Sequence, residues 1–200
     1  MEKIINIFGD SITWGASDEM GGWANRLRNY LAEKSEDYSE VYNLGISGDN
    51  TVGLLKRFAI ENEVRNPDTI IIAIGNNDSQ YIQSKDNPRV ALEKFESNLV
   101  EIVGQAKKFT KEIILVGITK VDEVKVAPTK WDDTKYYDNE NIALCNAKIK
   151  KICAKNNLLF IEMQDLLKDE DLEDGLHPNS KGHEKMFLRV KDFLEDNKII

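Results

Sequence analysis

The segment TIIIAI, residues 69–74, is a nearly continuous run of apolar residues. Such a run is typical of a central strand in a parallel sheet, because helices cover both faces of that strand. The segment leads directly into GNND, residues 75–78, whose glycine, asparagines and aspartate favour a turn. This stretch therefore predicts the middle of a parallel sheet, with polar side chains at the carboxyl end of its strand.

Segments with strand and helix patterns alternate on both sides of this run. Further strands are predicted over residues 3–8, 41–44, 112–118 and 158–161. Helices are predicted over residues 23–34, 51–63, 87–108, 137–156 and 179–195. The alternation predicts an α/β fold with helices on both faces of the sheet, in a single domain over residues 1–200. The irregular stretch 120–136 is expected to be a substrate-binding flap.

Composition and charge narrow the class of protein. The net charge of −8 argues against a nucleic-acid partner, which would require a basic face. No apolar run approaches the roughly 20 residues of a membrane span, so no stable membrane anchoring is expected. Cys145 and Cys153 are eight residues apart in a predicted helix, about 12 Å along its axis, which is too far for a disulfide. Reduced cysteines, and a start at residues 1–3 that leads straight into a strand, favour a cytoplasmic protein.

Four short polar segments, far apart in the sequence, can meet at one place. They are GDS at residues 9–11, ISGD at 46–49, GNND at 75–78 and DGLHP at 174–178. The first three each follow a predicted strand. Because ligands bind outside the carboxyl ends of the strands in such sheets, we expect these segments to form one site.

The residue types in these segments suit acyl transfer. Ser11 can be the nucleophile, His177 the base that takes its proton, and Asp174 the carboxylate that orients this base. Gly48 and Asn77, together with the amide of Ser11, can donate hydrogen bonds to a developing oxyanion. Taken alone, a serine after a strand more often caps a helix, and an asparagine at a strand end is ordinary turn chemistry.

Several nearby residues are interpreted as structural. Asp10 is expected to hold the turn before Ser11 through hydrogen bonds to backbone amides. The second histidine, His183, has no carboxylate three residues before it and is interpreted as a surface or helix-packing residue. Trp14 and Trp131 either line the substrate pocket or pack in the core.

The four segments, in this order, resemble the four sequence blocks of the SGNH hydrolases, also called the GDSL esterase/lipase family. The resemblance runs from residue 9 to residue 178. It implies a three-layer α/β/α sandwich with a flavodoxin-like five-stranded parallel sheet. It also implies that Ser11, Asp174 and His177 are catalytic, that Ser11, Gly48 and Asn77 form the oxyanion hole, and that neither a cofactor nor a metal is needed.

The sequence departs from the family pattern at two positions. Ile12 replaces the usual leucine after the GDS segment, and Asn76 replaces a frequent glycine before Asn77. The first is an exchange of one apolar residue for another. The second affects how readily the turn adopts its usual backbone conformation.

The expected function is hydrolysis of carboxylic esters through an acyl-enzyme, with small soluble acyl esters favoured as substrates. Lysophospholipase, thioesterase and carbohydrate O-acetylesterase activities are alternatives within the same family. Transfer of the acyl group to an alcohol instead of water also fits. A metal-dependent phosphoesterase is disfavoured because two-metal sites draw on more histidines than the two in this chain. A non-catalytic binding module is the alternative from another class. The sequence leaves the oligomeric state open.

Overall fold

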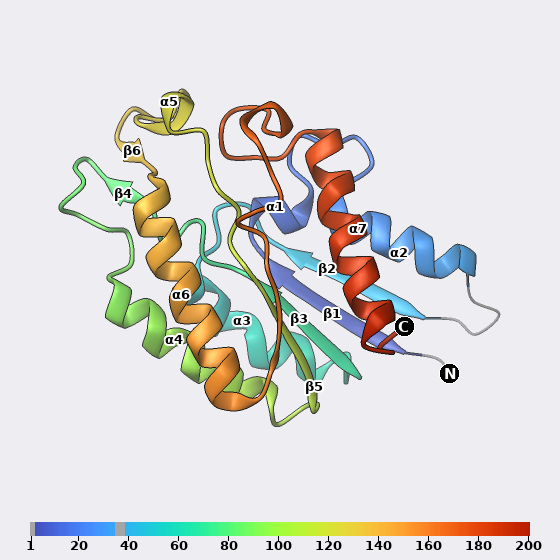
Figure 1. The fold of residues 1–200 in the computed structure, drawn as a ribbon. Helices are drawn as coiled ribbons and strands as arrows, with labels where there is room; N and C mark the ends of the chain where they lie inside the picture. The colour runs from blue at the N-terminus through green and yellow to red at the C-terminus, as the bar shows by residue number, and fades with distance from the viewer. Residues whose placement is uncertain (1–2, 35–38) are drawn as a thin grey trace.

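The computed structural model describes residues 3–34 and 39–200. Its centre is a parallel sheet of five strands in the order β2-β1-β3-β5-β7 (Figure 1). The strands are β1 (Ile4–Gly9), β2 (Glu40–Gly45), β3 (Thr69–Ala73), β5 (Glu112–Val116) and β7 (Leu159–Ile161). Counted along the chain this is the 2-1-3-4-5 order of flavodoxin-like sheets. The predicted fold class is therefore confirmed.

Helices cover both faces of this sheet, which makes three layers (Figure 1). One face carries α3 (Thr51–Glu63), α4 (Leu92–Ala106) and α6 (Asn139–Asn156), and the other carries α2 (Gly22–Lys34) and α7 (Ser180–Asp196). Ile70 and Ile72 of β3 point into the core beneath α3, α4 and α6, and Ile71 points into the core beneath α2 and α7. Because both faces of β3 are buried, its apolar run has no polar alternation.

Several short elements were not predicted. They are α1 (Ser11–Trp14), α5 (Glu123–Val126), the 3₁₀ helix η1 (Asp169–Asp171), and an antiparallel pair formed by β4 (Tyr81–Ile82) and β6 (Lys135–Tyr136). Both α5 and β6 lie in the stretch 120–136, so this stretch is less irregular than its sequence suggests. Figure 1 shows β4, β6 and α5 grouped at one end of the molecule.

The helix predicted over residues 87–108 is wrong at its start, because α4 begins only at Leu92. The residues before it fold back on the segment that follows β3. The amide of Ile82 donates to the carbonyl of Asn87 (2.9 Å), and the amide of Arg89 donates to the carbonyl of Gln80 (2.7 Å). These pairings within the loop replace the first turn of the expected helix and bring Arg89 to the carboxyl end of the sheet.

Two further expectations concern the cysteines and the membrane. Cys145 and Cys153 are both free and buried, and burial raises the pKa of each thiol to about 12. Within residues 3–34 and 39–200, no helix has both the length and the apolar character needed to cross a membrane. Residues 1–2, on which part of the localisation prediction rests, lie outside the described residues.

His183 is a residue of α7 that is buried against α2, and it is not a surface residue. Its side chain is fully buried. The backbone amide of Trp23 donates to its Nδ1 (3.3 Å), and its Nε2 lies 2.9 Å from the carbonyl oxygen of Ala16. These partners require a neutral ring with the proton on Nε2. Burial lowers the pKa of His183, although the Ala16 carbonyl acts in the opposite direction.

This pairing predicts a pH-dependent contribution to stability. A lowered folded-state pKa means that the unfolded chain takes up a proton first, so stability is lost as pH falls below about 6.5. We expect His183→Gln to lower the free energy of unfolding by about 1–3 kcal/mol at pH 7.5. Between pH 7.5 and 5.5 the wild type should lose about 1 kcal/mol more than the variant. Urea titrations of both proteins at the two pH values measure this difference, and parallel losses would contradict it.

Candidate active site

The turn after β1 places Ser11 at the first position of α1. Asp10 is the N-cap of this helix, and its Oδ1 accepts from the amide of Ile12 (2.9 Å). Gly9 makes the turn possible, since a Cβ there would lie 2.0 Å from Oγ1 of Thr13 and 2.6 Å from the carbonyl oxygen of Ala73. The predicted structural role of Asp10 agrees with this geometry.

Strand register brings the second and third polar segments to the same edge. Gly9 is paired with Gly45 of β2 on one side and with Ala73 of β3 on the other. The segments that contain Gly48 and Asn77 therefore begin level with the turn at Ser11. Both residues line the same cavity as Ser11.

Gly48 has a backbone conformation that favours glycine. Its φ is +78°, and a Cβ at this position would point into open space. Among the described residues, no acceptor is hydrogen-bonded to the amide of Gly48 or to that of Ser11. Two backbone N–H groups at the cavity are thus available to a ligand.

The C-terminal segment supplies a histidine and its carboxylate. Oδ1 of Asp174 accepts from the amides of Leu176 (3.0 Å) and His177 (2.8 Å), which fixes the carboxylate in its turn. Its Oδ2 lies 2.7 Å from Nδ1 of His177, and Nε2 of His177 lies 2.9 Å from Oγ of Ser11. With the Nδ1 proton donated to the carboxylate, Nε2 of a neutral ring accepts from the Ser11 hydroxyl.

The charge on Asp174 is favoured by its partners. Burial alone would raise the pKa of Asp174, but hydrogen bonds from the His177 ring and from the two backbone amides outweigh it and lower this pKa. Asp174 is therefore an anion at neutral pH, and it favours a positive charge on the neighbouring imidazole.

The cavity above Ser11 has a volume of about 360 Å³. Residues from five parts of the chain form its wall. They are Ser11, Gly48, Asn77, Gln80, Ile82, Arg89, Trp131, Lys135, Tyr137, Leu176 and His177. All three oxyanion-hole candidates and two of the three catalytic candidates therefore face one space, and Asp174 lies behind His177.

Comparison with known proteins identifies the family of the chain. Residues 7–185 match the model of the GDSL-like Lipase/Acylhydrolase family. The chain belongs to this family. It is accordingly an ester hydrolase, which disfavours the metal-dependent phosphoesterase and the non-catalytic binding module.

Individual members of the family show how far the likeness extends. The chain is 27% identical over 208 residues to the human isoamyl acetate-hydrolyzing esterase 1 homolog, covering 94% of this chain and 80% of that protein. A lipase/acylhydrolase from Enterococcus faecalis is similar in structure, with a TM-score of 0.81, 24% identity and coverage of 98% and 96%. An acetylxylan esterase from Geobacillus stearothermophilus gives a TM-score of 0.76, 24% identity and coverage of 96% and 93%. The two structures support the fold.

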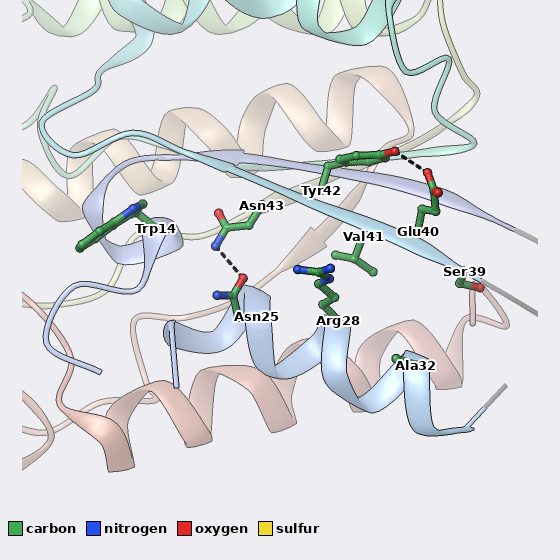
Figure 2. Close-up of a pocket in the computed structure, with 9 residues that line it drawn as sticks. All are labelled: Trp14, Asn25, Arg28, Ala32, Ser39, Glu40, Val41, Tyr42 and Asn43. Carbon is green, nitrogen blue, oxygen red and sulfur yellow. Dashed lines mark hydrogen bonds between the residues drawn. The ribbon is translucent and has the colours of Figure 1, made fainter. Parts of the chain in front are cut away.

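The two exposed tryptophans have different positions. Trp131 lines the cavity, and its ring centroid lies 5.8 Å from that of His177. Trp14 is 57% exposed and lines a separate cavity of about 620 Å³ between α2 and β2 (Figure 2). Figure 2 shows Asn43 of β2 hydrogen-bonded to Asn25 of α2 in that second cavity (3.2 Å). Trp14 therefore neither lines the pocket of Ser11 nor packs in the core, whereas Trp131 lines that pocket.

Sequence reasoning missed four side chains of the cavity wall. Gln80, Ile82 and Arg89 belong to the segment that folds back after β3, and Tyr137 follows β6. None lies in a motif of the chain. Trp131 and Lys135 place the stretch 120–136 in the cavity wall, and its role as a movable flap stays a prediction.

Asp78 acts as a structural carboxylate behind the site. It is fully buried and accepts from the amide (3.1 Å) and the hydroxyl (2.5 Å) of Thr51, at the first turn of α3. Burial raises the pKa of Asp78 to about 6, in spite of these hydrogen bonds. Burial likewise raises the pKa of Asp10 to about 7. Both carboxyl groups hold backbone turns, and neither lines the cavity.

The geometry predicts a large effect of Asp174→Asn. Asparagine can still accept from the two backbone amides, but its NH₂ group would donate to Nδ1 of His177 and force the ring proton onto Nε2, facing Ser11. We expect kcat on p-nitrophenyl acetate to fall by about 10³–10⁴-fold, the effect of a wrong tautomer. Asp169→Asn, an exposed change in η1, is the control and should retain full activity. A loss of less than tenfold in Asp174→Asn, with an unchanged circular dichroism spectrum, would contradict the assignment.

Proposed function

We propose that this chain hydrolyses small, soluble carboxylic esters through an acyl-enzyme formed on Ser11. The hydrogen-bonded series of Asp174, His177 and Ser11 carries the proposal. It joins a carboxylate, an imidazole and a hydroxyl in the order that activates a serine. The amides of Ser11 and Gly48 and the side chain of Asn77 add hydrogen-bond donors beside this hydroxyl.

Acylation follows from these positions. Oγ of Ser11 attacks the carbonyl carbon while Nε2 of His177 takes its proton. The carbonyl oxygen becomes an oxyanion and accepts from the amides of Ser11 and Gly48 and from Nδ2 of Asn77. The tetrahedral intermediate then collapses, and the leaving alcohol takes the proton from His177.

Deacylation uses the same groups. Nε2 of His177 takes a proton from water, whose oxygen attacks the acyl carbon. The oxyanion hole receives the second tetrahedral intermediate, which releases the carboxylic acid as Oγ of Ser11 regains a proton from His177. Every proton in the two steps moves to or from Nε2 of His177, while the amides of the oxyanion hole only donate hydrogen bonds.

The size of the cavity supports short acyl groups. Its volume of about 360 Å³ lies at the lower end of the roughly 300–1,000 Å³ usual for small-molecule sites. Two of the similar proteins are named for acetyl esters, isoamyl acetate and acetylxylan. Acetylated sugars are therefore the second candidate substrates, and the long acyl chain of a lysophospholipid fits the cavity less well.

Covalent labelling tests the nucleophile. A fluorophosphonate should form one adduct on Ser11, located by peptide mass spectrometry, and Ser11→Ala should abolish both labelling and ester hydrolysis while the chain stays folded. Ser47→Ala is a matched control, because Ser47 is exposed in the neighbouring polar segment. An adduct on Ser47 or another serine, or full activity of Ser11→Ala, would refute the proposal.

A substrate series tests the size preference. We expect kcat/KM to be highest for p-nitrophenyl acetate or butyrate, and at least about tenfold lower for p-nitrophenyl palmitate, because a long chain loses contact with so small a cavity. Acetylated xylose oligomers and an acyl thioester extend the series. A palmitate ester that reacts as fast as the acetate would show that the substrates are long-chain lipids.

A further inference from the structure

Both ends of the Asn77 side-chain amide are held by the protein. Its Nδ2 donates to the carbonyl oxygen of Asp49 (2.9 Å). Its Oδ1 accepts from Oη of Tyr137 (3.2 Å) and from Nη1 of Arg89 (3.3 Å). If the amide were turned over, its oxygen would face a carbonyl and its NH₂ group would face two donors. The three contacts thus select one orientation, which leaves the second Nδ2 proton for a ligand in the cavity.

The contact from Tyr137 belongs to a buried chain of hydrogen bonds. Tyr137 is only 1% exposed, and its hydroxyl oxygen accepts from Nε2 of Gln80 (2.6 Å). The hydroxyl proton is therefore free to be donated to Asn77. Burial raises the pKa of Tyr137 above its ordinary value of 10, so the hydroxyl keeps this proton at neutral and mildly alkaline pH.

Arg89 connects two segments of the oxyanion hole. Its Nη2 donates to the carbonyl oxygen of Gly48 (2.8 Å), and its Nη1 donates to Asn77 and to Oε1 of Gln80 (3.4 Å). Among residues 3–34 and 39–200, no carboxylate forms an ion pair with this guanidinium. The charge of Arg89 is thus directed at neutral oxygens, where it draws electron density from the Asn77 amide and makes its N–H a stronger donor.

We propose that Tyr137 and Arg89 are positioning residues of the oxyanion hole, which act on the reaction through Asn77 and the turn at Gly48. Tyr137 sets the orientation of the Asn77 amide, and Arg89 fixes this amide to the Gly48 turn while polarising it. This inference rests on the proposed function, since it assumes that Asn77 receives the oxyanion. Preorganised donors matter because they need no reorganisation when charge develops in the transition state.

A double-mutant cycle tests whether these residues act through Asn77. Tyr137→Phe removes only the hydroxyl, so we expect kcat on p-nitrophenyl acetate to fall about 5- to 10-fold while KM changes less than twofold. Asn77→Ala alone should lower kcat by about 10²–10³-fold. In the Asn77→Ala background, Tyr137→Phe should change kcat by less than twofold, because the group it orients is gone. Tyr136→Phe, in the neighbouring residue, is the matched control.

The same double-mutant cycle with Arg89→Gln is a second test, made at an exposed residue instead of a buried one. Arg89 is exposed, so this variant is expected to fold, and Arg89→Lys should recover little because an ammonium group cannot bridge two acceptors as a guanidinium does. A trifluoromethyl ketone, which forms a tetrahedral adduct, should bind each single variant more weakly by the same factor as the loss in kcat.

The possible outcomes separate the two proposals. Equal losses from Tyr137→Phe or Arg89→Gln with and without Asn77 would overturn the inference, as would unchanged kcat in both single variants. If the losses in kcat do not depend on Asn77 while Ser11→Ala is inactive and Ser11 is labelled, only the positioning role of Tyr137 and Arg89 is refuted. If Ser11 is neither labelled nor needed, the proposed function falls with it.

Discussion

The pairing of β1 with both of its neighbours is the constraint on which the site depends. Parallel strands end at the same edge, and here Gly9 is level with Gly45 and Ala73. Gly48 and Asn77, which follow Ser11 by 37 and 66 positions in the sequence, are therefore brought to the same cavity as Ser11. A shift of one residue in this register would turn the side chains of β1 to the opposite faces and move Ser11 away from Gly48 and Asn77.

The remaining half of the site comes from the other end of the chain. The turn with Asp174 and His177 follows η1 and precedes α7. Two backbone amides of this turn hold one carboxylate oxygen of Asp174, and the other oxygen contacts the His177 ring. Burial raises the pKa of Asp10 and Asp78, whereas hydrogen bonds keep that of Asp174 low. The charged carboxylate of Asp174 thus lies against the imidazole of His177, whereas the more buried carboxyl groups of Asp10 and Asp78 hold turns.

The sequence predicted those helices and strands whose residue pattern follows directly from which side chains are buried. The apolar run of β3 and the periodic pattern of α3 depend on burial alone, and both elements lie where the sequence placed them. The start of α4 was wrong because residues 87–89 pair through their backbone with residues 80–82 of the same loop, and this pairing replaces the first turn of the predicted helix. Tyr137 was missed because its contact with Asn77 joins residues 60 apart in the sequence, and no motif records such a contact.

The most direct test of the account is a crystal structure of the protein after inhibition by diethyl p-nitrophenyl phosphate. The phosphorus should be bound to Oγ of Ser11, and the phosphoryl oxygen imitates the oxyanion. We expect this oxygen to lie about 2.7–3.1 Å from the amides of Ser11 and Gly48 and from Nδ2 of Asn77. A phosphoryl oxygen turned away from these three donors, or an adduct on a different residue, would contradict the account.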